Sequence, residues 1–154
     1  MKVSEIMTKA TVTDAADDSL AEAAARMWNA QTGSLLVMDG ENMLGIVTER
    51  DLLRAVANGL DPKQVPLKDV MRTDVVTCGP QTTLKEAANL MATKWFRHLP
   101  VVEGGKVVGI LSQRDLTGML AQALHEPEAL HQLVESSSLI RERRLKRIEA
   151  GDLD

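Results

Sequence analysis

The feature that most constrains the fold of this chain is an internal repeat. A shift of 64 positions places residues 3–57 over residues 67–121 without a gap, and 17 of the 55 aligned pairs are identical. The identical pairs include Gly45/Gly109, Arg50/Arg114 and Asp51/Asp115. A gap-free match of this length indicates a tandem duplication, so the fold should contain two similar units.

The repeat divides the chain into three parts. Residues 1–60 form the first repeat, residues 61–124 form the second, and residues 125–154 lie outside the duplication as a predicted helical tail. The junction NGLDPKQVP is rich in glycine and proline, which suits a turn between the units.

Each repeat predicts the same order of elements, β-α-β-β-α. The first helices follow the capping-box pairs Ser19/Glu22 and Thr83/Glu86 and carry apolar residues at helical spacing. Two apolar strands follow, joined by the tight turns DGEN and GGK, and a second helix begins near RDL. The expected fold is therefore of the α/β (α+β) class. Two such units should pack sheet against sheet with pseudo-two-fold symmetry and leave clefts for a ligand.

Composition narrows the class of protein. The chain has 154 residues, 44% hydrophobic and 26% charged, and no apolar run approaches the ~20 residues of a membrane helix. The N-terminus has no apolar signal core, so we expect a cytoplasmic protein without membrane contact. The single cysteine allows no internal disulfide. A net charge of −4 and only three aromatic residues argue against a general nucleic-acid binder.

Both repeats end a strand with a hydroxyl residue that is followed, three positions later, by a carboxylate. These pairs are Thr48/Asp51 and Ser112/Asp115. They could simply cap the next helix. Alternatively, each carboxylate could accept two hydrogen bonds from ribose hydroxyls while the hydroxyl contacts ribose or phosphate. The capping interpretation does not explain the arginine before each aspartate, because the helix dipole disfavours a cation there.

These features together resemble a pair of cystathionine-β-synthase (CBS) domains, known as a Bateman module. The resemblance covers roughly residues 1–124 and includes the IMT and VMR openings, the RHLPVV segment and both Thr/Ser-x-x-Asp endings. It implies a regulatory module, not an enzyme, that binds an adenosyl ligand. AMP, ADP or ATP is expected first, with S-adenosylmethionine or NAD as alternatives, and no metal is predicted.

The resemblance also implies a set of site residues. Asp51 and Asp115 would bind ribose, Thr48 and Ser112 ribose or phosphate, and Arg97 and His98 phosphate. The adenine side would involve Thr13, Thr77, Ser34, Leu35, Leu99 and Pro100, and Arg114 completes the set. Only the second repeat has the Arg97–His98 pair, since the first has Gly33 and Ser34 there.

Family members commonly form homodimers and signal through conformation, so we expect a homodimer and an unidentified protein partner. Two alternatives remain open from the residues alone. One is a structural or interaction module without a physiological nucleotide. The other is a nucleic-acid-linked regulator that uses the basic run RERRLKR at 141–147, although acidic residues outnumber basic ones across the tail. A solvated or dimer-packing helix explains that run better.

Overall fold

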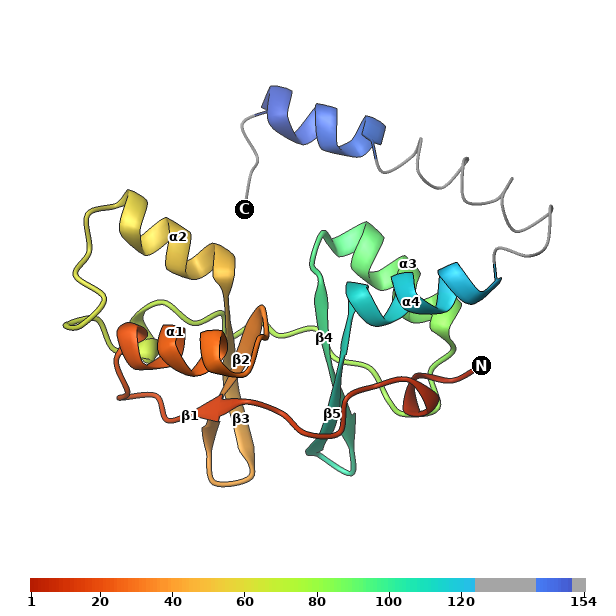
Figure 1. The fold of residues 1–154 in the computed structure, drawn as a ribbon, viewed down its shortest axis with the longest axis horizontal. Coiled ribbons are helices and arrows are strands. Elements are labelled where there is room, and N and C mark those ends of the chain that lie inside the picture. Colours follow the sequence, from red (N-terminus) through yellow and green to blue (C-terminus); the bar gives the residue numbers. More distant parts are fainter. Residues whose placement is uncertain (124–140, 151–154) are drawn as a thin grey trace.

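A computed structural model describes residues 1–123 and 141–150 of the chain. Two α+β units lie side by side, each with a β-hairpin and two helices (Figure 1). The two hairpins face each other across the middle of the molecule, and strands β3 and β5 touch there. The fold class and the two-repeat architecture predicted from the sequence are therefore confirmed.

The first unit contains a three-stranded sheet and two helices. Its elements are β1 (Thr13–Asp14), α1 (Leu20–Asn29), β2 (Ser34–Asp39), β3 (Asn42–Thr48) and α2 (Glu49–Ala57). Strand β1 pairs in parallel with β2, and β2 pairs antiparallel with β3. The helices α1 and α2 pack against each other and against this sheet.

The second unit has the same plan with a shorter sheet. It contains α3 (Leu84–Lys94), β4 (His98–Glu103), β5 (Lys106–Ser112) and α4 (Gln113–Ala123). The strand predicted at 75–78 is reduced to a single parallel bridge between Cys78 and Val101. The hairpin β4–β5 otherwise repeats the pairing and the irregular register of β2–β3.

The first helix of each unit begins with the predicted capping box. The Ser19 hydroxyl accepts a hydrogen bond from the Glu22 amide at 3.2 Å, and the Glu22 carboxylate accepts one from the Ser19 amide at 2.8 Å. The same reciprocal pair joins Thr83 and Glu86. These bonds satisfy amide groups that a helix N-terminus leaves without partners, which fixes where both helices start.

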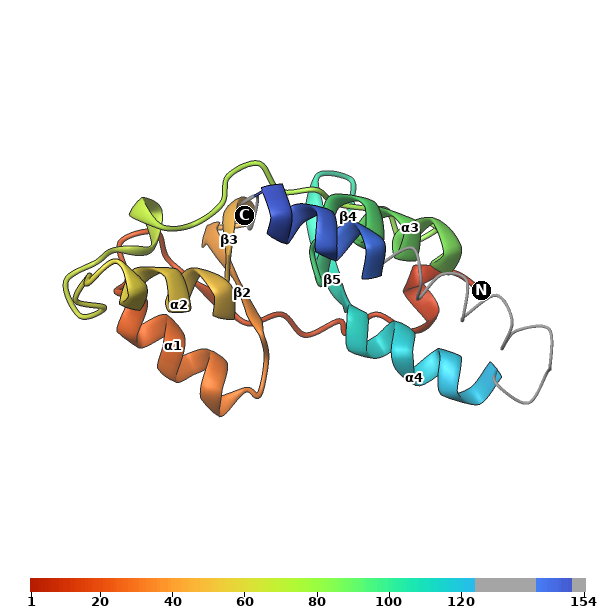
Figure 2. The same ribbon diagram turned by 90° about the horizontal axis from the view of Figure 1, so that it is seen from above.

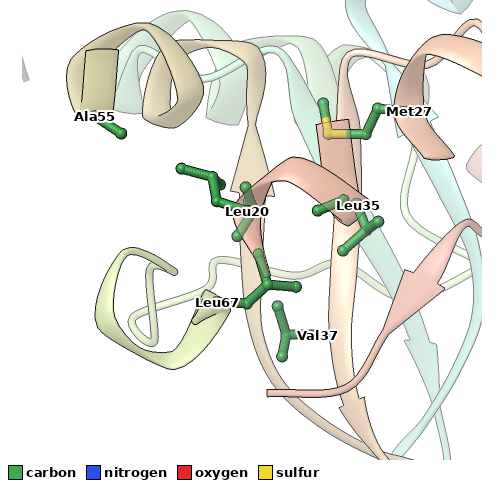
Figure 3. Packing of buried hydrophobic residues seen from close by; sticks show 8 residues of the cluster. Leu20, Met27, Leu35, Val37, Ala55 and Leu67 are labelled. Carbon is green, nitrogen blue, oxygen red and sulfur yellow. The ribbon is translucent and has the colours of Figure 1, made fainter. Parts of the chain in front are cut away.

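Two short 3-10 turns, which the sequence patterns did not predict, connect the units. They are η1 (Val3–Glu5) and η2 (Leu67–Asp69), and each packs on the repeat to which it does not belong in sequence. Val3 is completely buried in the core of the second unit. Leu67 is completely buried in the core of the first, beside Leu20 and Val37 (Figure 3). Each core is thus completed by the other repeat, which holds the two units together.

The repeated glycines of β3 and β5 make this crossing possible. A Cβ atom on Gly45 would stand 2.7 Å from the Arg72 carbonyl oxygen, and one on Gly109 would stand 2.9 Å from the Thr8 carbonyl oxygen. Both distances are far below van der Waals contact, so any side chain would push the crossing segment away. The two glycines therefore allow the backbones to approach closely.

The predicted tail, residues 125–154, is described only at 141–150, which forms a helix. This helix lies above the seam between the two units in both ribbon views (Figure 2). The Arg147 guanidinium stands over the Trp95 ring at 5.5 Å from its centroid. Among the described helices, none is both long and apolar enough to cross a membrane.

Candidate functional site

A cavity of about 590 Å³ lies between the two units. The first unit contributes the chain before β1 and the loop from the end of α1 into β2. The second unit contributes the starts of β4 and α4 and the end of β5. We call this cavity the large pocket. Its volume lies in the range of ligand pockets in proteins, about 300–1,000 Å³.

A second cavity of about 110 Å³, the small pocket, is the counterpart of the first. The 64-residue shift that relates the repeats also relates the two linings. Thr8, Ser34 and Ser112 line the large pocket, and their counterparts Arg72, His98 and Thr48 line the small one. The duplication therefore produced two related cavities with different chemistry.

Asp115 offers an oxygen atom to the large pocket. Its Oδ2 atom accepts hydrogen bonds from the Ser112 amide and hydroxyl, both at 2.7 Å, which caps helix α4. No group in the described part of the chain donates to its Oδ1 atom, and the side chain is only half-buried. The capping role thus uses one carboxylate oxygen and leaves the other for a ligand.

Asp51, the counterpart of Asp115, is completely engaged by its own chain. Its Oδ2 atom accepts hydrogen bonds from the Thr48 amide and hydroxyl, both at 2.8 Å. Its Oδ1 atom pairs with Arg54 and lies 3.5 Å from Nε of Arg72. The side chain is fully buried and does not line the small pocket. Asp51 therefore stabilises the fold, and no oxygen of it is left for a ligand.

The two aspartates differ in their ion pairing because the residues at two neighbouring positions differ between the repeats. Arg54 and Arg72 neutralise Asp51, whereas the counterparts of these arginines in the 64-residue shift are Gly118 and Thr8. Neither glycine nor threonine carries a charge. Asp115 therefore has no ion-pair partner among the described residues.

The predicted pair Arg97–His98 lies at the seam and lines both pockets. His98 packs on Gly33 of the other unit, where an added Cβ would stand 3.1 Å from the imidazole. Burial, and next the Arg97 charge, lowers the pKa of His98 below its usual value, which disfavours the protonated imidazole. Nη2 of Arg97 lies 3.4 Å from Oε2 of Glu49, and both side chains are about half exposed.

Ser34 is a further polar residue of the large-pocket lining. Its hydroxyl is buried, and no hydrogen-bond partner for it occurs among the described residues. A buried hydroxyl without a partner costs about 1–3 kcal/mol. Because Ser34 belongs to the lining, a rotation of its side chain toward the large pocket would let a ligand or water there remove this cost.

The structure brings about half of the predicted site residues together. The large pocket is lined by Ser34, Arg97, His98, Ser112, Arg114 and Asp115. The small pocket is lined by Thr48, Arg97 and His98. The residues that line neither pocket are Thr13, Thr77, Leu35, Leu99, Pro100 and Asp51. Leu35, Leu99 and Pro100 are buried, while Thr13 and Thr77 are exposed on the surface.

Several lining residues were not among the predicted ones. They are Thr8, Thr11, Thr32, Glu49 and Thr117 at the large pocket, and Arg50, Arg72 and Trp95 at the small one. The sequence could have indicated Arg50 as a site residue, because it belongs to the Arg-Asp pair that both repeats contain. Thr8 and Arg72 belong to the IMT and VMR openings, but the sequence did not assign them to a site, because they reach the cavities only through the crossing segments.

The large pocket is suited to an uncharged polar group with an attached anion. Its lining balances Glu49 and Asp115 against Arg97 and Arg114, and adds several hydroxyl groups. A carboxylate oxygen can accept from vicinal hydroxyls, and a guanidinium can donate to a phosphate. No group of three or more metal-ligating side chains occurs within residues 1–123 and 141–150.

Comparison with known proteins identifies the two repeats. The family model described as "CBS domain" matches residues 3–58 and again residues 67–122, which together make up more than half of the chain. The chain is 35% identical to the CBS domain-containing protein YhcV of Bacillus subtilis, over 74% of its own length and 81% of that protein. It is also 38% identical to an uncharacterized 17.7 kDa protein of Acidianus ambivalens, over 77% and 73% respectively.

Solved structures show the same fold. A CBS-domain containing protein from Agrobacterium tumefaciens matches with a TM-score of 0.74 and 33% identity, covering 77% of this chain and 98% of that one. A CBS domain protein from Pyrobaculum aerophilum, complexed with AMP, matches with a TM-score of 0.72 and 27% identity. That match covers 88% of this chain and 99% of the other.

Proposed function

The chain belongs to the CBS domain family, and we propose that it binds an adenosyl ligand of the AMP type in the large pocket. The free Oδ1 atom of Asp115, which no described residue neutralises, carries this proposal. It would accept hydrogen bonds from the two ribose hydroxyls. The buried Ser34 hydroxyl would gain a partner, and Arg97 would donate to the phosphate. The AMP complex of the relative from Pyrobaculum aerophilum supports the same ligand class.

The output of this binding event would be a change in conformation. The large pocket takes its lining from both repeats, so a ligand that fills it favours one relative arrangement of the units. The crossing segments would transmit the change, because each is anchored in the core of the opposite unit. A partner protein, or a second copy of the chain, would read the arrangement. We propose regulation, not catalysis, as the role of this chain.

A panel of ligands tests the proposal by thermal unfolding. AMP, ATP, adenosine, S-adenosylmethionine and NADH are each added to the full chain at increasing concentration. At 100 times its dissociation constant, a ligand stabilises the folded state by about 2.7 kcal/mol, which raises the Tm by several degrees. If no adenosyl compound raises the Tm at millimolar concentration, the chain is instead a structural module whose Thr/Ser-x-x-Asp motifs serve only as helix caps.

The phosphate contact of Arg97 gives a more specific prediction. Arg97→Ala should lower the affinity for AMP about tenfold or more and leave the affinity for adenosine nearly unchanged, as measured by calorimetry. The exposed ion pair with Glu49 contributes little to stability, so the fold should survive the change. The dependence of AMP affinity on salt should also become weaker.

Lys106→Ala provides a matched control for Arg97→Ala. Lys106 forms an exposed ion pair with Glu41 of the other unit, at 2.6 Å, and lines neither pocket. The control removes the same charge and should leave both affinities unchanged. An equal loss of AMP and adenosine binding in Arg97→Ala would show that the arginine holds the shape of the pocket, not the phosphate.

We further propose that the chain forms a homodimer through its first unit. Helices α1 and α2 pack together and leave large apolar side chains in solvent, with Trp28 83%, Leu53 69% and Val56 64% exposed. A second copy would remove this apolar surface from water. Light scattering at micromolar concentration should give the mass of a dimer, and Leu53→Asp with Val56→Asp should give a monomer. A monomeric wild-type chain would contradict the proposal.

A further inference from the structure

The small pocket concentrates positive charge. Arg50, Arg72 and Arg97 all line it, and Asp74 is the one carboxylate of the lining. Outside the lining, Asp51 lies 3.5 Å from Arg72 and Glu49 lies 3.4 Å from Arg97, so Arg50 is the lining arginine without an ion pair to a carboxylate among the described residues. Burial lowers the pKa of Arg50, and so do the nearby charges of Arg97, Arg72 and Arg147. Protonated arginines brought together in this way repel one another, and an anion between them would relieve the repulsion.

The same pocket lacks what a nucleoside needs. Its volume of about 110 Å³ is well below the range of ordinary ligand pockets. Asp51, the counterpart of Asp115, is buried and fully engaged by Thr48, Arg54 and Arg72, so it offers no oxygen to ribose hydroxyls. A small, strongly charged anion therefore fits the small pocket better than a second nucleoside does.

Helix 141–150 brings a further arginine to this pocket. Arg147 stands over the ring of Trp95, and Trp95 itself lines the small pocket. Within the helix, Arg147 is half-buried, whereas the other nine residues are exposed. The described contact of the helix with the body of the protein is thus centred on the edge of an arginine-lined cavity.

We propose that the small pocket binds a small phosphate anion, with pyrophosphate as its model, and that Arg147 closes over it. The cation–π contact with Trp95 is weak where both groups meet solvent, and the positive charge of Arg50 opposes the approach of Arg147. A bound anion makes the electrostatic field at the pocket attract Arg147 instead of repelling it. Anion binding and docking of helix 141–150 therefore strengthen each other by the same factor.

Calorimetry with inorganic pyrophosphate tests the site. The full chain should bind it, and Arg50→Ala should lower the affinity about tenfold or more, because a charge-assisted contact is lost. Arg147→Ala should lower the affinity by a similar factor. The matched control is Arg143→Ala, which removes the same charge from an exposed position of the same helix and should change the affinity less than threefold.

Fluorescence tests the docking of the helix. Trp28→Phe keeps an aromatic ring on the proposed dimer surface and leaves Trp95 as the sole tryptophan. Pyrophosphate should change the Trp95 emission with the same midpoint as the calorimetric titration. Arg147→Ala should remove most of this change, and Arg143→Ala should retain it. Equal effects of these two substitutions, in either measurement, would overturn the role of Arg147.

Pyrophosphate binding in the small pocket should not require a ligand in the large pocket. Asp115→Ala should leave pyrophosphate affinity unchanged, since Asp115 does not line the small pocket. If AMP binds and pyrophosphate does not, the anion site is wrong while the proposed function stands. If pyrophosphate binds normally and no adenosyl compound does, the proposed function is wrong while the anion site stands.

Discussion

Asp115→Ala should lower the affinity for AMP about a hundredfold or more and leave the fold nearly as stable as before. Two hydrogen bonds from ribose hydroxyls to a carboxylate are lost, each worth about 1.5–3 kcal/mol. A loss of 2.8 kcal/mol already corresponds to about a hundredfold. The free energy of unfolding should fall by only about 1 kcal/mol, because the hydrogen bonds of Asp115 with the described residues are limited to the cap of helix α4.

Calorimetry gives the affinity in this experiment, and urea unfolding gives the stability. Asp115→Asn is the conservative companion, because it keeps one oxygen atom and removes the charge. Its affinity for AMP should lie between those of the wild type and the alanine variant. AMP binding of wild-type strength in Asp115→Ala would remove this carboxylate from the site, and with it the main support for the proposed function.

Asp51→Ala should have the reverse pattern, with a large loss of stability and a small change in AMP affinity. Asp51 is fully buried, caps helix α2, and pairs with Arg54 and Arg72. The loss of these contacts should lower the free energy of unfolding by about 3 kcal/mol. Both arginines are 42% exposed and can turn to water, which keeps the cost below that of stranding a buried charge.

The two aspartates thus form an internal comparison between equivalent positions of one chain. Urea unfolding should show a much lower midpoint for Asp51→Ala than for Asp115→Ala, with similar slopes. AMP affinity of Asp51→Ala, measured at a temperature where the variant is folded, should stay within about threefold of the wild type. Equal stability losses in the two variants would contradict the different burial and pairing that the structure gives them.

The elements that the sequence predicted well are those set by local signals. Helices α1 and α3 begin at the predicted capping boxes, because cap and carboxylate lie three residues apart. The hairpins also follow their turn sequences. The crossing of η1 and η2 was not predicted, because it depends on contacts between residues far apart in sequence. Gly45 and Gly109 marked the repeat in the sequence, but only the structure shows that the crossing segments approach the backbone at these two residues.

The candidate site shows the same limit. The repeated Asp51 and Asp115 suggested two equivalent ribose contacts, yet Arg54 and Arg72 make one of them structural. The sequence shows these arginines and their uncharged counterparts Thr8 and Gly118, but only the fold shows that they reach the carboxylate. Likewise, the sequence assigned the Arg97–His98 pair to the second repeat alone. The structure places the pair at the seam, where it lines both pockets.

The most direct test of the central claim is a crystal structure of the full chain with AMP. The proposed function predicts AMP in the large pocket, with its ribose hydroxyls within hydrogen-bonding distance of Oδ1 of Asp115 and its phosphate near Arg97. The Ser34 hydroxyl should have a partner in that complex. AMP bound through the small pocket and Asp51 instead, or a large pocket that stays empty at millimolar AMP, would contradict the account.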